Sequence, residues 1–121
     1  MTRIGLIGLA GAAGALSRYA IGVALGGRLY PYGTLAINVI GSFLLGLLLG
    51  GPGASRWSET ATLALGVGFL GAFTTFSTFT NETMDLLRDG RATAALIYVF
   101  LSLALGLAAA AIGWTVGQDL T

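Results

Sequence analysis

Long hydrophobic runs divide the chain into four segments that are separated by short polar connectors. A helix needs about 20 residues to cross a hydrocarbon core of ~30 Å, and the runs cover approximately residues 4–26, 34–50, 61–83 and 93–117. Their hydrophobic residues are continuous rather than alternating, which excludes the strand pattern of a membrane β-barrel. We therefore predict an all-α membrane protein with four transmembrane helices.

The connectors hold the residues that suit a membrane interior least. They span residues 27–33, 51–59 and 85–91. Both prolines lie in connectors, where a missing N–H does least harm. No room is left for a soluble domain, so we expect one transmembrane domain over residues 1–121. Aromatic residues that suit the membrane interface fall near the predicted span ends, at Tyr30, Tyr32, Trp57 and Trp114.

Composition supports the membrane class and narrows the possible chemistry. Hydrophobic residues make up 55% of the chain and charged residues 9%, whereas about a quarter of residues are charged in an average soluble domain. Lysine, histidine and cysteine are absent, which removes the usual zinc, haem and iron–sulfur ligands and any Cys or His nucleophile. A net charge of +1 gives no basic surface for nucleic acid. We therefore expect neither an enzyme nor a nucleic-acid partner.

The arginines are divided almost evenly between the two sides of the predicted domain. Orientation usually follows an excess of Lys and Arg on the cytoplasmic side. Arg3 and Arg56 fall on the side of the termini, and the other side has Arg28, Arg88 and Arg91. A chain with so little bias can insert both ways, which favours a dual-topology antiparallel homodimer. The alternative is that this small difference is noise and one orientation dominates.

Small residues recur at a spacing of four in three predicted helices: Gly22 and Gly26, Gly46 and Gly50, and Gly113 and Gly117. This spacing lets helix backbones approach closely, so that van der Waals packing holds a bundle together where lipid supplies no hydrophobic drive. We expect a tightly packed bundle. The pattern does not indicate what the bundle carries.

Residues 71–82 hold a mixture of side chains that is unusual for a lipid-facing helix. Five Ser/Thr hydroxyls, three phenylalanines and a carboxylate follow a hydrophobic run. Hydroxyls can donate hydrogen bonds and aromatic ring edges carry positive charge, so both can face an anion. The glycines and threonines in and before this stretch have poor helix propensity. We predict that the third helix breaks near its middle, at residues 71–75, where it must be buried or line a cavity.

Polar residues also recur at helical spacing in the second and fourth predicted spans. Thr34, Asn38 and Ser42 share one stripe, and Tyr98 and Ser102 repeat the spacing. Polar groups at membrane depth are costly unless they pair or face a cavity, so these stripes can line an ion pathway. Alternatively, Asn38 satisfies the backbone of a neighbouring helix and Tyr98 is an interface anchor.

Three further residues of the third span fall on one face, and one charge lies in the first span. Phe76, Phe79 and Glu82 follow at steps of three, a pattern that pathway lining and simple packing both explain. Glu82 can cap an entrance, pair with an arginine or be solvated. Arg18 needs a cavity, a carboxylate or a helix end, unless it reaches the interface with its long side chain.

Three stretches resemble a known family in order and spacing. They are residues 14–19 (Gly-Ala-Leu-Ser-Arg-Tyr), 33–43 (Gly-Thr-Leu-Ala-Ile-Asn-Val-Ile-Gly-Ser-Phe) and 71–79 (Gly-Ala-Phe-Thr-Thr-Phe-Ser-Thr-Phe). They resemble the signatures of the CrcB or Fluc family of fluoride channels, and the third is highly specific. The resemblance implies a dual-topology homodimer with two antiparallel pores, which passively exports fluoride across the inner (plasma) membrane of a bacterium.

The resemblance also implies roles for individual residues. Phe76 and Phe79 resemble paired phenylalanines whose ring edges face fluoride. The other implied pathway residues are Asn38, Ser77, Thr78, Tyr98 and Ser102, and those implied at the vestibule and entrance are Arg18 and Glu82.

A structural sodium ion is implied in the same way. Gly71 and Thr74 match the positions whose backbone carbonyls, two from each subunit, hold sodium at the dimer centre. The chain departs from the pattern at Gly106 and Ala110, where some relatives carry hydroxyls. We expect that part of the polar track on the fourth helix to be absent or filled with water.

Two other functions fit parts of the sequence. A small proton-coupled multidrug exporter can also be four-helical and dual-topology, but it needs a membrane-embedded carboxylate, for which Glu82 is the one candidate. A scaffold subunit that transports nothing would explain the glycine spacing and leave the clustered hydroxyls and phenylalanines unexplained. Selectivity for fluoride over chloride rests on the resemblance alone.

Overall fold

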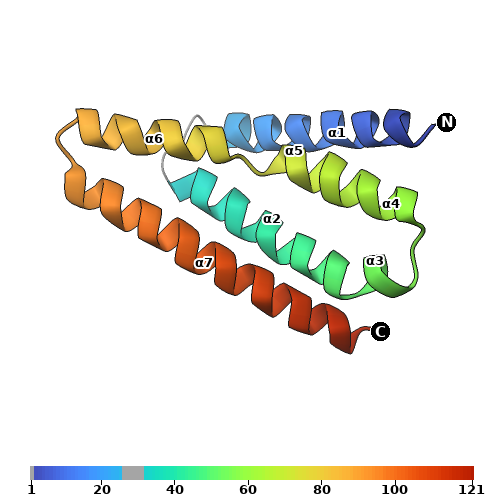
Figure 1. Ribbon diagram of the computed structural model, residues 1–121. Helices are drawn as coiled ribbons and strands as arrows, with labels where there is room; N and C mark the ends of the chain where they lie inside the picture. The colour runs from blue at the N-terminus through green and yellow to red at the C-terminus, as the bar shows by residue number, and fades with distance from the viewer. Residues whose placement is uncertain (1, 26–31) are drawn as a thin grey trace.

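The computed structural model describes residues 2–25 and 32–121, and there the chain consists of helices joined by short turns (Figure 1). Three long helices are continuous: α1 (Arg3–Ala24), α2 (Tyr32–Gly50) and α7 (Ala92–Asp119). Together with the broken third segment, four helical segments in these ranges are long and apolar enough to cross a membrane. The predicted all-α fold with four spans is confirmed.

The third span is built from shorter pieces that follow one another in nearly the same direction (Figure 1). They are α4 (Glu59–Leu63), η1 (Ala64–Leu70), α5 (Gly71–Phe73) and α6 (Phe76–Arg88). The segment η1 is π-helical, a local widening of the helix that often marks functional regions. A further short helix, α3 (Pro52–Ser55), lies in the second connector. The sequence analysis predicted neither η1 nor α3.

The described helix ends differ from the predicted ones mainly at the third connector. The helix α6 continues to Arg88 and α7 begins at Ala92, so the predicted connector at 85–91 shrinks to a tight turn. Gly90 has a φ of 75° in this turn, which glycine adopts without steric cost. Three residues named in the sequence analysis lie outside the described ranges, namely Gly26, Arg28 and Tyr30.

The helices α2 and α7 pack against each other along a seam of glycines, which we call the glycine seam. A Cβ added at Gly46 or Gly50 would collide with the backbone of α7. A Cβ added at Gly113 or Gly117 would collide with the backbone of α2. The two glycine pairs are therefore close-packing positions, as their spacing predicted.

The helix α1 packs alongside η1 and α5 (Figure 1). A Cβ added at Gly14 would collide with the Phe69 carbonyl oxygen, and one at Gly68 would lie 2.7 Å from the Ile7 carbonyl oxygen. This close contact positions α1 against the upstream half of the third span.

Much of the outer surface is hydrophobic. Leu96, Leu103 and Leu107 of α7 are each more than half exposed, a surface that suits hydrocarbon rather than water. The aromatic residues expected at the interface that are described here, Tyr32, Trp57 and Trp114, are exposed as well. A small buried cluster lies where α6 meets α7 and contains Phe79, Leu86, Ala95 and Tyr98.

Candidate functional site

The third span is interrupted by two extended residues. The helix α5 ends at Phe73 and α6 begins at Phe76. Between them lie Thr74, with φ −82° and ψ 160°, and Thr75, with φ −149° and ψ 118°. Figure 1 shows this break as the coil between α5 and α6. The predicted break is confirmed and is shorter than expected, because Gly71 is still helical.

Asn38 of α2 holds the extended segment through both ends of its amide group. The Thr75 N–H donates to Asn38 Oδ1 at 2.8 Å, and Asn38 Nδ2 donates to the Thr75 carbonyl at 3.0 Å. We call this pair of bonds the Asn38 clasp. It satisfies backbone groups that have left the helical ladder. Of the two interpretations of Asn38, the structure shows the one in which it binds a neighbouring backbone. A role for its second amide hydrogen in an ion pathway stays a prediction.

Threonine hydroxyls stabilise both helix ends at the break. Thr75 Oγ1 accepts a hydrogen bond from the Thr78 N–H at 3.1 Å, which caps the start of α6. Thr74 Oγ1 donates to the Leu70 carbonyl at 3.0 Å. The two β-branched residues that weaken the helix therefore also supply bonds that replace part of it.

Arg18 of α1 reaches the upstream side of the same break. Its Nε donates to the Ala72 carbonyl at 3.4 Å, and the side chain is partly buried. A cation is stabilised at the carboxyl end of a helix, where carbonyl groups lose their helical donors. Of the partners predicted for Arg18, the helix end is confirmed.

Two of the backbone carbonyls that the break leaves without their helical donors belong to Gly71 and Thr74. In a continuous α-helix each N–H donates to the carbonyl four residues earlier. The Thr75 N–H donates to Asn38 rather than to Gly71. The Thr78 N–H donates to the Thr75 hydroxyl rather than to Thr74. Carbonyl oxygens freed in this way are ligands that hard cations prefer. The carbonyl oxygens of Gly71 and Thr74 are therefore suitable ligands for sodium.

A hollow of about 250 Å³ lies against the break. We call it the break hollow, and the described residues that line it are Asn38, Gly41, Ser42, Leu45, Leu70, Gly71, Thr74, Thr75 and Phe76. A Cβ added at Gly41 would collide with the Thr74 methyl group, so glycine at this position allows α2 to approach the break. The hollow opens to the molecular surface, where the Phe76 side chain is 73% exposed.

The two phenylalanines of the expected pathway have adjacent rings in different surroundings. The ring centres of Phe76 and Phe79 are 5.8 Å apart, with the planes inclined at 56°. Phe79 is only 8% exposed and makes an edge-to-face contact with Tyr98, whose ring centre is 5.2 Å away. Their predicted common face is confirmed. Within one chain Phe79 packs in the core, whereas Phe76 is exposed at the break hollow.

Glu82, Tyr98 and Thr34 form a buried polar cluster between α2, α6 and α7. The Tyr98 hydroxyl donates to Glu82 Oε1 at 3.4 Å, and the two residues are 3% and 6% exposed respectively. Thr34, also buried, lies beside the Glu82 carboxylate. The interpretation of Tyr98 as an interface anchor is wrong, and so is that of Glu82 as a solvated residue, because three helices enclose both side chains.

The remaining hydroxyls of the expected pathway are placed differently from one another. Ser77 is exposed, with its Oγ 3.5 Å from Thr75 Oγ1, and Thr78 is half-buried at the start of α6. Ser102 Oγ on α7 is buried and has no hydrogen-bond partner within residues 2–25 and 32–121. A buried hydroxyl without a partner indicates a place for water or an ion.

Several of the expected site residues fall into two groups. Asn38, Phe76 and the threonines of the break meet at the break hollow. Phe79, Tyr98 and Glu82 lie together further along α6. Ser77, by its exposure, belongs to neither enclosed group within one chain.

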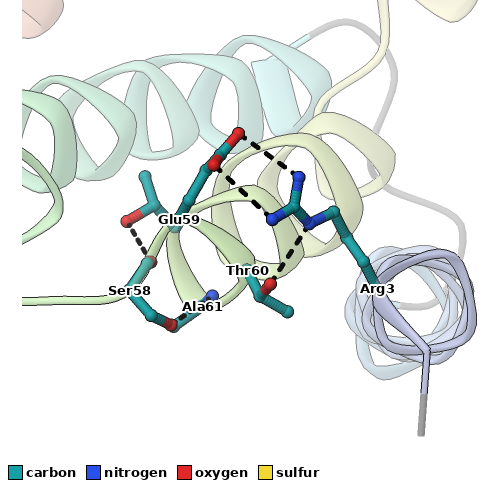
Figure 2. Close-up of polar contacts among 6 residues, drawn as sticks. Arg3, Ser58, Glu59, Thr60 and Ala61 are labelled. Atoms are coloured by element: carbon teal, nitrogen blue, oxygen red, sulfur yellow. Dashed lines mark hydrogen bonds and ion pairs between the residues drawn. The ribbon is translucent and has the colours of Figure 1, made fainter.

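Two ion pairs were not predicted from the sequence. The Arg3 guanidinium donates to both carboxylate oxygens of Glu59, at 3.3 and 3.5 Å, and to the Thr60 hydroxyl at 3.2 Å (Figure 2). This contact joins the starts of α1 and α4 across 56 positions of sequence, a separation at which no local pattern signals pairing. On the opposite side, Arg88 pairs with Asp85 at 3.0 Å. Within residues 2–25 and 32–121, each side of the domain thus has one ion pair.

Comparison with known proteins gives consistent matches over nearly the whole chain. The sequence profile of a family described as "CrcB-like protein, Camphor Resistance (CrcB)" matches residues 5–114. A protein of Moorella thermoacetica named fluoride-specific ion channel FluC 2 is 46% identical, over 94% of this chain and 95% of its own length. A fluoride-specific ion channel FluC of Thermus thermophilus is 45% identical, over 99% of this chain and 98% of its own.

A third relative, the fluoride-specific ion channel FluC of Geobacter sulfurreducens, is 49% identical over 88% of this chain and 90% of its own. All three organisms are bacteria. Together with the four apolar helices, these relatives identify the chain as a multi-pass protein of a bacterial cell membrane.

Proposed function

The chain belongs to the CrcB family, and from that premise we propose that it is a fluoride-selective channel through which fluoride leaves the cell passively. The relatives carry this activity in their names. The break hollow is the observation that supports it most directly, because an amide, hydroxyls and an aromatic ring line it and its described lining residues are all uncharged. Neutral donors can bind a small anion without trapping it, which conduction requires.

In this proposal fluoride moves from the break hollow along α6 towards the buried polar cluster. Phe76 and Phe79 present ring edges. Hydroxyls come from Ser77, Thr78, Tyr98 and Ser102, Asn38 offers its second amide hydrogen, and Arg18 and Glu82 stand at the vestibule and the entrance. A small anion gives up tightly held water on entering a narrow pore, so replacement donors must be close and numerous. The buried, unpartnered Ser102 hydroxyl fits that need.

A second, inverted copy of the chain completes the pathway in this proposal. The break hollow opens to the surface at membrane depth, and lipid cannot satisfy the polar groups of an interrupted helix. A second copy that covers the hollow would exclude lipid from Thr74 and Thr75. The even division of arginines favours opposite orientations of the two copies, which gives a dual-topology homodimer with two antiparallel pores.

We further propose a structural sodium ion between the two copies. The carbonyls of Gly71 and Thr74 have lost their helical donors to the bonds at the break, and they would hold the ion, two from each chain. Bound sodium would supply fixed positive charge next to the break hollow and would stabilise the extended backbone.

Fluoride efflux from liposomes tests the channel directly. Purified protein is reconstituted in liposomes loaded with potassium fluoride or potassium chloride, a potassium ionophore is added so that potassium leaves with the anion, and efflux is followed with ion-selective electrodes. We expect rapid loss of fluoride and retention of chloride. Absence of fluoride efflux, or equal chloride efflux, would contradict the proposal. In the same assay with sodium added on both sides of the membrane, replacement of that sodium by a large organic cation is expected to reduce the flux if the ion is structural.

The structure gives the multidrug exporter no comparable support. Its one candidate proton carrier, Glu82, is not among the described residues that line the break hollow and is bonded to Tyr98. Uptake of a cationic dye driven by a proton gradient, abolished by Glu82→Gln, is the result that would favour the exporter.

A further inference from the structure

The packing between α2 and α7 opens at Gly106. At Gly46 of α2, an added Cβ would collide with the Ala110 carbonyl of α7. One turn earlier, a Cβ added at Gly106 would meet, among the described residues outside its own helix, only Ser42 Oγ, at 3.9 Å. The two helices are therefore locked at Gly46 and leave space for at least a methyl group at Gly106.

The register of the two helices pairs their polar stripes. The observed contacts pair Ser42 with Gly106, Gly46 with Ala110 and Gly50 with Trp114. Each step advances both helices by about one turn, so they run parallel in a constant register. One turn before the first pair, this register brings Asn38 to the level of Ser102. The polar face of α2 thus lies opposite the polar face of α7, beyond the end of the glycine seam.

One hydroxyl borders the gap at Gly106, and a second lies one turn away on the same face of α7. Ser42 lines the break hollow, and its Oγ is the atom nearest to the empty side-chain position of Gly106. Ser102 lies one turn before Gly106 on the same face of α7, and its Oγ is buried without a partner in the described part of the chain. A buried hydroxyl in that state indicates a place for water or an ion, and Ser102 lies one helical turn from the space at Gly106.

We propose that Ser42 and Ser102 form a binding subsite for partly dehydrated fluoride in the gap at Gly106. The inference rests on the proposed channel function and adds Ser42 to its pathway. Both hydroxyls are neutral donors, so the subsite binds the ion without trapping it and connects the break hollow with the cluster around Tyr98.

Removal of the Ser42 hydroxyl is the first test. In the liposome assay, Ser42→Ala is expected to lower fluoride efflux roughly tenfold, the effect of losing one hydrogen bond to an ion. Ser17→Ala is the matched control, because the Ser17 hydroxyl donates to the Ala13 carbonyl of its own helix at 2.7 Å. That variant is expected to conduct like the wild type. Unchanged efflux in a folded Ser42→Ala protein would overturn the subsite, and this is also the outcome if the gap holds water only.

A rescue experiment separates the hydroxyl from the packing. In the Ser42→Ala background, Gly106→Ser returns a hydroxyl to the gap from the opposite helix, whereas Gly106→Ala fills the same space with a methyl group alone. We expect the serine variant to recover most of the lost efflux and the alanine variant to recover none. Equal recovery by both, or by neither while both elute as monodisperse dimers, would contradict the proposal.

A double-mutant cycle tests whether the two serines hold the same ion. If they do, the loss of efflux in Ser42→Ala/Ser102→Ala is smaller than the product of the two single losses. Independent, multiplicative losses would place the serines at separate sites and refute a shared subsite. Failure of the channel itself is recognised separately, since the folded wild type would then show no fluoride efflux at all.

Discussion

The two halves of α2 contact the rest of the molecule in different ways. Its second half meets α7 through the glycine seam, where Gly46 and Gly50 bring backbone against backbone. Its first half carries Thr34, Asn38 and Ser42 and meets α6, α7 and the break through polar groups. The seam leaves no space and fixes the distance between the helices. Next to the polar half, which that seam holds in place, there is space at Gly106, and the unpartnered Ser102 hydroxyl of α7 lies one turn from it.

The largest effect is expected from filling the glycine seam. In Gly46→Leu the added side chain collides with the α7 backbone, which cannot move aside as a flexible side chain can. We expect the free energy of unfolding to fall by about 3 kcal/mol or more. In detergent, the variant should therefore unfold at a lower temperature than the wild type. Gly8→Leu is the matched control, because nothing lies within 4 Å of a Cβ at Gly8. Equal thermal stability of the two variants would show that the seam does not fix the helices.

A smaller but still large effect is expected from loss of the Asn38 clasp. Asn38→Ala leaves the N–H and the carbonyl of Thr75 unpaired in a partly buried place. We expect about 2 kcal/mol of destabilisation, faster hydrogen exchange at the Thr75 amide and loss of fluoride efflux. Asn38→Asp retains an acceptor for the Thr75 N–H and loses the donor. It should therefore protect that amide from hydrogen exchange without restoring fluoride efflux. Unchanged exchange at Thr75 in Asn38→Ala would disprove the clasp.

Replacement of the buried ring should affect conduction more than folding. Phe79→Ile keeps most of the hydrophobic bulk next to Tyr98 and removes the ring edge. We expect a stability loss below about 1.5 kcal/mol and a drop in fluoride efflux of roughly tenfold. Phe76→Ile removes the exposed ring at the break hollow, and its fluoride efflux is compared with that of Phe79→Ile. Wild-type efflux in both variants would remove the rings from the mechanism.

The smallest effect is expected at the ion pair between the starts of α1 and α4. The side chains of Arg3 and Glu59 are 49% and 73% exposed, and exposed pairs contribute about 0–1 kcal/mol. Arg3→Gln should therefore leave thermal stability almost unchanged. Added salt, which weakens the wild-type contact, should change the thermal stability by an equally small amount. A loss beyond about 2 kcal/mol, twice what exposed pairs usually supply, would show that this contact, rather than glycine packing, holds α1 in place.

The sequence could predict what depends on local composition. Continuous hydrophobic runs identified the four spans, and glycines followed by Thr74 and Thr75 located the break. The spacing of Gly46 and Gly50 indicated close packing correctly. Each of these features is determined within a few neighbouring residues, so the pattern along the chain contains it.

Features that depend on contacts between distant residues could not be predicted. Asn38 and Thr75 are 37 positions apart, and two interpretations of the asparagine stayed open until its bonds were known. The burial of Glu82 and Tyr98 depends on the way α6 meets α7. The π-helical segment η1 has no side-chain signature of its own, since the same apolar residues also suit an α-helix.

Because of the Asn38 clasp, positions 38 and 75 should differ in their tolerance of mutation. It binds only backbone atoms of Thr75, so any residue except proline presents the same N–H and carbonyl at position 75. Position 38 must supply a donor and an acceptor at one fixed reach, which aspartate, serine and the longer glutamine do not reproduce. In a library of all single variants, position 38 should therefore accept almost no replacement. Position 75 should be limited mainly by the hydroxyl that caps α6.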